Sequence, residues 1–244
     1  MKKFYEKNEI WFAVIFIIVY VVGTALADMF SDMIGVGKSI TVAYTFALSI
    51  FLFVWIFKSG LKEKYGLVIP KFNFKKDLFY LPLLVLISVN FFFGARLNAN
   101  ALETVLYVLS MFAVGFLEEI IFRGLLFKAM AKDNLKVAII VSSLTFGIGY
   151  IVNLITGNGA LVATILQVVY ATAVGFLFVI IFLKGGSLLP CIIAHALVNA
   201  TSIFSAQDES ILWMQLVTAG VVIVVALAYS VYLIKAQKEK AQKE

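Results

Sequence analysis

Apolar residues dominate the chain in long runs that short polar segments separate. A run of about 17–25 apolar residues is long enough for an α-helix to cross the hydrocarbon core of a membrane. Glycine and lysine mark several of the joins, as at Lys58-Ser59-Gly60 and Lys184-Gly185-Gly186. The pattern predicts eight membrane spans, near residues 10–30, 40–58, 77–95, 105–127, 136–155, 160–183, 187–205 and 211–234.

The composition agrees with a membrane protein. Of the 244 residues 63% are hydrophobic and 14% are charged, whereas soluble domains carry about 25% charged residues. The joins between the runs are short, and the chain contains no internal repeat. We therefore expect one transmembrane helical domain over residues 1–244, an all-α polytopic bundle of about eight transmembrane helices embedded in the lipid bilayer.

Basic residues gather at one set of joins. Eighteen of the 20 lysines and arginines belong to the N-terminus, to the segments around the ends of spans two, four and six, and to the tail, which leaves Lys38 and Arg96 on the other side. Because cytoplasmic loops carry an excess of basic residues, we expect cytoplasmic N- and C-termini. The lysine-rich composition suggests a bacterial cell membrane. The net charge of +6 reflects topology, and the aromatic–basic interleaving that nucleic-acid binding favours is missing.

The first predicted span has some features of a secretory signal peptide. Two lysines precede the apolar run, and Ala25-Leu26-Ala27 resembles an A-x-A cleavage site. However, Glu6 and Glu9 also precede the run, and the run is long and aromatic. We therefore expect an uncleaved first helix.

A charged stretch interrupts the fourth predicted span at residues 116–123. Each charge near the centre of a span costs roughly 2.5–3.5 kcal/mol on insertion scales. On a helix Glu119 and Arg123 are four residues apart and can form an ion pair. Glu118 points about 100° away from Glu119 and has no cationic partner on its own helix. We expect Glu118 to act as a general base toward a water molecule.

His195 is the only histidine, which limits the metal chemistry that this chain can support. The H-E-x-x-H zinc site requires two histidines one turn apart. A zinc site with three protein ligands would have to recruit several carboxylates beside His195 and Cys191, the single cysteine. The chain also has no G-x-S-x-G motif and no glycine-rich phosphate loop. We expect neither a metal nor another cofactor.

Two further pairs of residues lie four positions apart, as neighbours on one helix face do. His195 and Asn199 share one helix face, where they can donate two hydrogen bonds to a developing oxyanion or simply hold two helices together. Phe146 and Tyr150 also share a face, with Asn153 close to it. For this group the alternative to substrate binding by Phe146 and Asn153 is ordinary membrane packing and interface anchoring.

These three sites, in this order, resemble the signatures of the membrane-embedded CAAX-protease and bacteriocin-processing family (CPBP), also called intramembrane glutamic endopeptidases. The family signatures are E-E-x-x-x-R, F-x-x-x-H and H-x-x-x-N, on successive helices of an eight-helix fold. Glu118 and Glu119 with Arg123 match the first signature, and His195 with Asn199 match the last.

The resemblance covers about residues 105–205 and implies hydrolysis of peptide bonds within the membrane. It assigns water activation to Glu118, an oxyanion hole to His195 and Asn199, and a supporting role to the Glu119 ion pair. The implied partner is a peptide or membrane-protein substrate, and some bacterial members are linked to bacteriocin immunity. A site near the cytoplasmic end of span four would receive its substrate from the lipid or from the cytoplasmic boundary.

The chain departs from the family at one position, because Tyr150 stands where the second signature has its histidine. In the family that histidine works with the glutamate on the water, and a phenol with a pKa near 10 does not share protons readily at neutral pH. A catalytically silent scaffold for immunity or regulation is therefore an alternative. A proton-coupled transporter with Glu118, Glu119 and His195 as a relay is another, although the inverted repeat of such transporters is missing.

Overall fold

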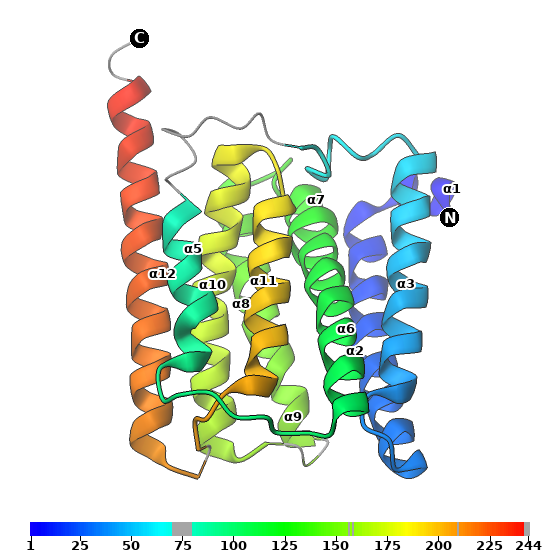
Figure 1. The fold of residues 1–244 in the computed structure, drawn as a ribbon. Helices are drawn as coiled ribbons and strands as arrows, with labels where there is room; N and C mark the ends of the chain where they lie inside the picture. The colour runs from blue at the N-terminus through cyan, green and yellow to red at the C-terminus, as the bar shows by residue number, and fades with distance from the viewer. Residues whose placement is uncertain (70–79, 156, 158, 209, 242–244) are drawn as a thin grey trace.

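The chain folds into a bundle of helices that run side by side (Figure 1). The computed structural model describes residues 1–69, 80–155, 157, 159–208 and 210–241, and side chains up to residue 235. Within this part of the chain the regular elements are helices, with one isolated antiparallel bridge between Ala95 and Ser205. The predicted all-α polytopic fold is confirmed.

The first half of the bundle leads up to the charged stretch. Its elements are α1 (Lys2–Lys7), α2 (Glu9–Ile34), α3 (Ser39–Lys58), α5 (Leu81–Ser88) with the 3₁₀ turn η2 (Val89–Phe91), α6 (Ala101–Glu118), the π-helical η3 (Glu119–Phe127) and α7 (Lys128–Met130). The second half begins at α8, and its elements are α8 (Leu135–Ile148), η4 (Gly149–Ile151), α9 (Val152–Ile155), α10 (Leu161–Gly185), α11 (Leu189–Thr201), η5 (Ser202–Phe204) and α12 (Leu212–Ala241).

Six of the eight predicted spans are helices long and apolar enough to cross a membrane, namely Glu9–Ile34, Ser39–Lys58, Ala101–Met130, Leu135–Ile155, Leu161–Gly185 and Leu212–Lys235. The third and seventh spans are shorter apolar helices, Leu81–Phe91 and Leu189–Phe204. At 1.5 Å per residue these two rise about 16 and 24 Å, less than a hydrocarbon core of about 30 Å. A proline in the first turn, Pro82 or Pro190, begins each of them, which hydropathy alone does not reveal. Residues 77–79 of the predicted third span lie outside the described residues.

Asparagine caps fix where three of the helices begin. The side chains of Asn8, Asn100 and Asn134 accept hydrogen bonds from the backbone N–H groups three residues further on, at 2.9, 2.9 and 3.1 Å. Asparagine at this position satisfies an N–H that the helix leaves unpaired. The cap at Asn100 sets the start of α6, and so the depth at which the charged stretch lies.

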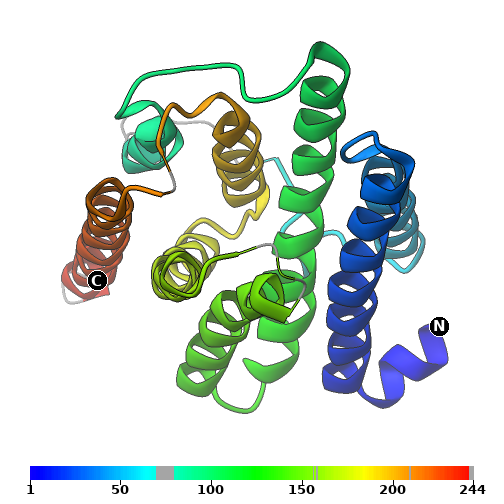
Figure 2. The same cartoon turned by 90° about the horizontal axis from the view of Figure 1, so that it is seen from below.

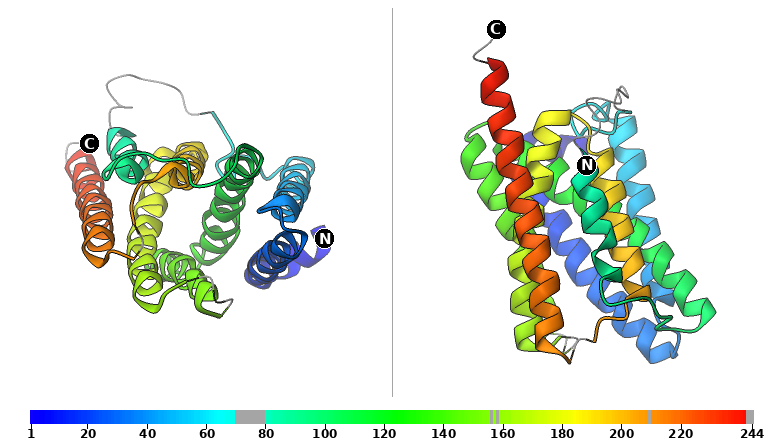
Figure 3. Two further views of the ribbon diagram at one scale, coloured as in Figure 1. Left: turned by 60° about the horizontal axis from the view of Figure 1, so that its bottom comes forward. Right: turned by 60° about the vertical axis from the view of Figure 1, so that its left-hand side comes forward.

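Helix α6 occupies the middle of the bundle. Seen from below, α2 and α3 lie on one side of α6, and α10, α11, α12 and α5 lie on the other (Figure 2). Helices α3 and α11 pack directly against α6, while α8 and α2 pack against η3. Helix α12 forms the outer edge beside α5 and α10 (Figure 3). The central helix therefore meets neighbours from both halves of the chain.

Large apolar side chains cover much of the outer surface. Ile18, Leu84, Ile140 and Val224 expose 55–65% of their area. In water such a surface would favour association, whereas lipid tails solvate it. The polar and charged groups discussed next lie inside the bundle instead.

Candidate active site

The two adjacent carboxylates lie where α6 passes into η3. Glu119 and Arg123 are fully buried, and Glu118 is 8% exposed. Every residue of η3 is buried, so this part of the central helix is enclosed on all sides. Helical turns with π geometry are rare and are frequent at functional sites.

Arg123 neutralises the inner carboxylate. Its Nη1 donates to Glu119 Oε1 at 3.0 Å, so the ion pair predicted from their spacing is present. The guanidinium lies 4.1 Å from the centroid of the Phe146 ring, a cation–π contact. On α10 a Cβ at Gly175 would come within 3.0 Å of Arg123 Nη2, so the absence of a side chain there makes room for the guanidinium.

His195 bridges both carboxylates. Its Nδ1 lies 2.9 Å from Glu119 Oε1, and its Nε2 lies 3.2 Å from Glu118 Oε2. The prediction that Glu118 has no cationic partner therefore holds only within its own helix, because α11 supplies an imidazole from 77 positions later. Two carboxylates face one guanidinium, so a proton on the imidazole brings the charge of the buried cluster to zero, which a low-dielectric site favours.

Gly115 brings α6 and α11 close enough for this contact. A Cβ at Gly115 would lie 2.7 Å from the backbone nitrogen of Ala196 and 2.8 Å from its Cα. Small residues allow membrane helices to approach in this way. The imidazole edge also faces aromatic rings, since Phe146 and Phe178 lie with centroids 5.6 and 5.9 Å from that of His195. The histidine is thus held by packing as well as by charge.

Tyr20 is a functional candidate that the sequence did not single out. From α2, its hydroxyl donates to Glu118 Oε1 at 2.6 Å, and the side chain is 6% exposed. Phe12, Phe16 and Tyr20 follow one another at intervals of four residues, and all are buried. This spacing places the Tyr20 hydroxyl on the same helix face as two buried aromatic rings, which is the sequence pattern that could have indicated it. Each carboxylate oxygen of Glu118 therefore has a partner: the Tyr20 hydroxyl for Oε1 and His195 Nε2 for Oε2.

The remaining predicted residues line the cavity next to this cluster. Tyr150 and Asn153 line it from η4 and α9, and Asn199 lines it one turn after His195. Phe146 also lines it, and its ring meets Tyr150 edge to face with centroids 5.8 Å apart. Asn153 Nδ2 donates to Gln167 Oε1 at 3.1 Å. The structure thus brings all eight predicted residues to one site. Glu118, Glu119, Arg123, His195 and Phe146 form one cluster linked by contacts, and Tyr150, Asn153 and Asn199 lie along the cavity wall.

The cavity has a volume of about 1060 Å³, at the upper end of the usual range for ligand sites. Its wall runs from Glu118 and Phe122 to Lys38, Arg96 and Asp208, in the connections at the end of the bundle opposite both termini (Figure 1). The sequence suggested access from the lipid or from the boundary on the side of the termini. The wall leads instead to the opposite face, so the cavity does not favour entry at the boundary on the side of the termini, and access from the lipid stays a prediction.

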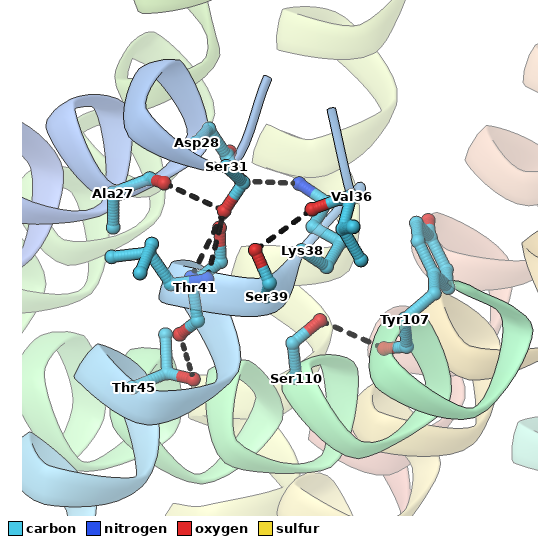
Figure 4. Close-up of polar contacts among 11 residues, drawn as sticks. Ala27, Asp28, Ser31, Val36, Lys38, Ser39, Thr41, Thr45, Tyr107 and Ser110 are labelled. Carbon is cyan, nitrogen blue, oxygen red and sulfur yellow. Dashed lines mark hydrogen bonds and ion pairs between the residues drawn. The ribbon is translucent and has the colours of Figure 1, made fainter. Parts of the chain in front are cut away.

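A polar network shapes the rim of the cavity (Figure 4). Lys38 Nζ and Thr41 Oγ1 both donate to Asp28 Oδ1, at 2.7 and 2.5 Å, and all three residues line the cavity. Ser31 Oγ accepts from the backbone of Ile40 at 3.0 Å. Lys38 has a left-handed φ of 63°, which costs a residue with a side chain about 1–2 kcal/mol. These bonds fix the turn that joins α2 to α3.

A model of the family described as type II CAAX prenyl endopeptidase Rce1-like matches residues 100–201. The match runs from the cap of α6 to the end of α11 and contains both carboxylates, Arg123 and His195. Residues 100–201 are therefore similar to the Rce1-like family. The resemblance noted in the motifs is confirmed, and the Rce1-like family is a family of intramembrane CAAX-type proteases. No curated protein matches the chain.

The segment that matches the Rce1-like model coincides with the family-like core expected near residues 105–205. It does not include Tyr20, which reaches Glu118 from α2. The contact with Tyr20 shows that the N-terminal helices complete the surroundings of the site. That residues 1–244 form a single domain stays a prediction.

Proposed function

We propose that the Rce1-like domain is a glutamate-dependent endopeptidase in which Glu118 activates water for attack on a peptide bond. The observation that carries this proposal is the placement of Glu118 in the cavity wall, with Tyr20 holding Oε1 and His195 Nε2 lying 3.2 Å from Oε2. A general base must lie within hydrogen-bond reach of the proton it removes. Oε2 itself is buried, but the Glu118 side chain is 11% exposed and lines the cavity, so the attacking water would approach the carboxylate from that exposed part.

His195 and Asn199 serve as the donors to the oxyanion in this proposal. His195 Nε2 lies 3.2 Å from Glu118 Oε2, and Asn199 lines the cavity one helical turn away. A carbonyl group placed there would have the base on one side and two donors on the other. Preorganised donors of this kind are commonly the largest contribution to acyl-transfer catalysis.

Glu119 and Arg123 act as positioning residues. Glu119 Oε1 accepts from both Arg123 Nη1 and the His195 side, at 3.0 and 2.9 Å. This arrangement fixes the ring orientation of His195, because Nδ1 is engaged and Nε2 is directed toward Glu118. Phe146 and Asn153 would contact the substrate, a peptide or a membrane protein, along the wall.

The alternative function is a catalytically silent scaffold for immunity or regulation, and Tyr150 is the observation that favours it. Tyr150 lines the cavity where the family signature has a histidine. A missing general acid–base partner reduces rates by about 10²–10⁴-fold. The hydroxyl of Tyr20, bonded to Glu118, supports the carboxylate in the scaffold and in the enzyme alike, so only activity separates the two.

Mass spectrometry of newly formed N-termini tests the proposal on the proteins and peptides of the membrane itself, so no single substrate has to be chosen. Membranes from cells that make the wild-type protein are compared with those that make Glu118→Gln, His195→Ala or, as a control, Glu63→Gln. Glu63 is exposed in the connection after α3, so its variant matches the loss of a carboxylate away from the cavity. We expect termini that depend on Glu118 and His195 but not on Glu63. Identical termini in all four membranes, at equal protein levels, would support the scaffold.

A further inference from the structure

We propose that the cavity opens to the extracytoplasmic face of the membrane and takes an extended polypeptide segment from that side. The direction of the opening follows from the structure and the charge distribution. The nature of the substrate rests in addition on the proposed protease function.

One end of the bundle gives the cavity its opening. The wall is formed by the halves of α2, α6, α8, α10 and α12 that lie away from the termini, and by the connections beyond them. Arg96 and Asn98 come from the connection between α5 and α6, and Gln207 and Asp208 from that between α11 and α12. The turn at Lys38 completes the rim.

The other end of the bundle is closed by packed side chains. Tyr65, Phe127, Phe182 and Leu188 each expose at most 1% of their area. The connection after α3 is joined to the start of α11 by a bond from Leu188 N to Gly66 O at 2.8 Å. At Gly66, whose φ is +66°, a Cβ would lie 2.4 Å from the Phe182 ring, so backbone and aromatic rings are in close contact there.

Charge identifies which end faces the cytoplasm. At the open end lie two basic residues, Lys38 and Arg96, and the acidic residues Asp28, Asp32, Glu103 and Asp208. The basic residues described at the closed end are Lys2, Lys3, Lys7, Lys58, Lys62, Lys64, Lys128, Lys132, Lys136, Lys184 and Lys235. Because basic residues are retained on the cytoplasmic side, the closed end is cytoplasmic and the cavity faces outward.

The depth of the site limits what can reach it. Glu118 lies 17 residues after Ala101, the first residue of α6 at the open end, a rise of about 25 Å along the helix. An extended chain covers at most about 3.3–3.6 Å per residue. A substrate that enters from the open end therefore needs about seven extended residues before its scissile bond meets Glu118, which excludes bonds within a folded domain.

The wall has the chemistry to hold such a segment. Amide side chains occur along it, at Asn90, Asn153, Gln167, Asn199 and Gln207. All but Asn199 make hydrogen bonds to other groups of the wall, which a substrate would exchange for its own. An amide can both donate and accept hydrogen bonds, which suits the N–H and C=O groups of an extended backbone. A lipid tail has no such groups, so a polypeptide fits this wall better.

Labelling of single cysteines in intact cells tests the direction of the opening. Cys191, the native cysteine, is fully buried, so the wild-type chain supplies the unlabelled background. Ala25→Cys and Ala163→Cys place thiols in the cavity wall. Asp133→Cys places one on an exposed residue of the closed end, between α7 and α8. A membrane-impermeant maleimide is applied before and after permeabilisation, in the Glu118→Gln background as well, so that the result does not depend on catalysis.

We expect both cavity thiols to react in intact cells, and the thiol at position 133 to react only after permeabilisation. Reaction at position 133 in intact cells would overturn the proposal. So would cavity thiols that need permeabilisation, or that react only after denaturation. The substrate assignment has its own readout, the cleavage sites lost in Glu118→Gln: we expect them in extracytoplasmic segments at least about seven residues from a folded domain, and cytoplasmic sites would overturn that assignment alone.

Discussion

Replacing Tyr20 by phenylalanine removes one oxygen atom and tests whether Glu118 has to be held in place. The hydroxyl donates to Glu118 Oε1 at 2.6 Å, and the ring is buried, so the packing of α2 is retained. A hydrogen bond to a charged group contributes about 1.5–3 kcal/mol, and 1.36 kcal/mol is tenfold in rate. We expect kcat to fall about 10- to 150-fold, toward the lower end because water in the cavity can replace the donor.

Tyr44→Phe is the matched control for this substitution. The Tyr44 hydroxyl also makes a 2.6 Å hydrogen bond, but it donates to the backbone carbonyl of Val19 rather than to a carboxylate of the candidate site. Both variants are compared with the wild type in thermal unfolding and in cleavage of a peptide identified from the new N-termini. We expect a lower kcat with little change in KM for Tyr20→Phe, and neither change for Tyr44→Phe.

Two results would refute the reasoning about Tyr20. One is wild-type kcat in Tyr20→Phe at equal protein concentration, because Glu118 would then need no partner on Oε1. The other is an equal fall in both variants, since the loss would then reflect the stability of α2 rather than the orientation of Glu118.

Three further variants probe the packing and chemistry of the cluster. Gly115→Ala should push α11 away, lowering both Tm and activity, whereas Gly220→Ala, where an added Cβ meets nothing within 4 Å, should change neither. Arg123→Ala takes the guanidinium away from the buried Glu119 and leaves it only the contact with His195; breaking a buried ion pair costs about 3–5 kcal/mol, measured by unfolding in detergent. Tyr150→His should keep or raise the rate of cleavage, because an imidazole can share the proton of the water at neutral pH.

Each of these variants has an outcome that contradicts its premise. Unchanged activity in Gly115→Ala would mean that the close approach of α6 and α11 is not needed for the contact of His195 with Glu118. An Arg123→Ala protein as stable as the wild type would show that water compensates the carboxylate. Loss of cleavage in Tyr150→His would indicate that the phenol itself is required.

Local spacing was enough to predict part of the site. The ion pair of Glu119 with Arg123 and the shared face of His195 and Asn199 depend only on helical periodicity. The structure shows the ion pair, and it places His195 and Asn199 four residues apart in one continuous helix, α11. The bundle followed from the apolar runs. The roles assigned to Glu118, His195 and Asn199 stay predictions, since they concern reactivity rather than position.

Other features depend on contacts between distant parts of the chain. Tyr20 reaches Glu118 across 98 positions, and no local pattern specifies that two helices meet there. The direction in which the cavity opens depends on side chains that come from several helices and connections. The aromatic side chains that pack around Tyr65 at the other end are apolar like most of the chain, so the sequence does not distinguish them. Hydropathy also placed the end of the third span too late, because the apolar residues Phe92 and Phe93 continue past the helix end at Phe91.

The π-helical run from Glu119 to Phe127 has a consequence for insertions and deletions. Hydrogen bonds in a π-helix join residues five apart instead of four, so this run accommodates more residues per turn than an α-helix. Deleting one residue there would let the helix relax to α geometry, without a break in its backbone bonding. The cost would fall inside the run: a deletion between Glu119 and Arg123 would shorten their spacing from four residues to three and move Arg123 from the ring of Phe146, whereas the helical residues on either side would keep their register. Length variation in this helix would therefore alter the active site while sparing the fold.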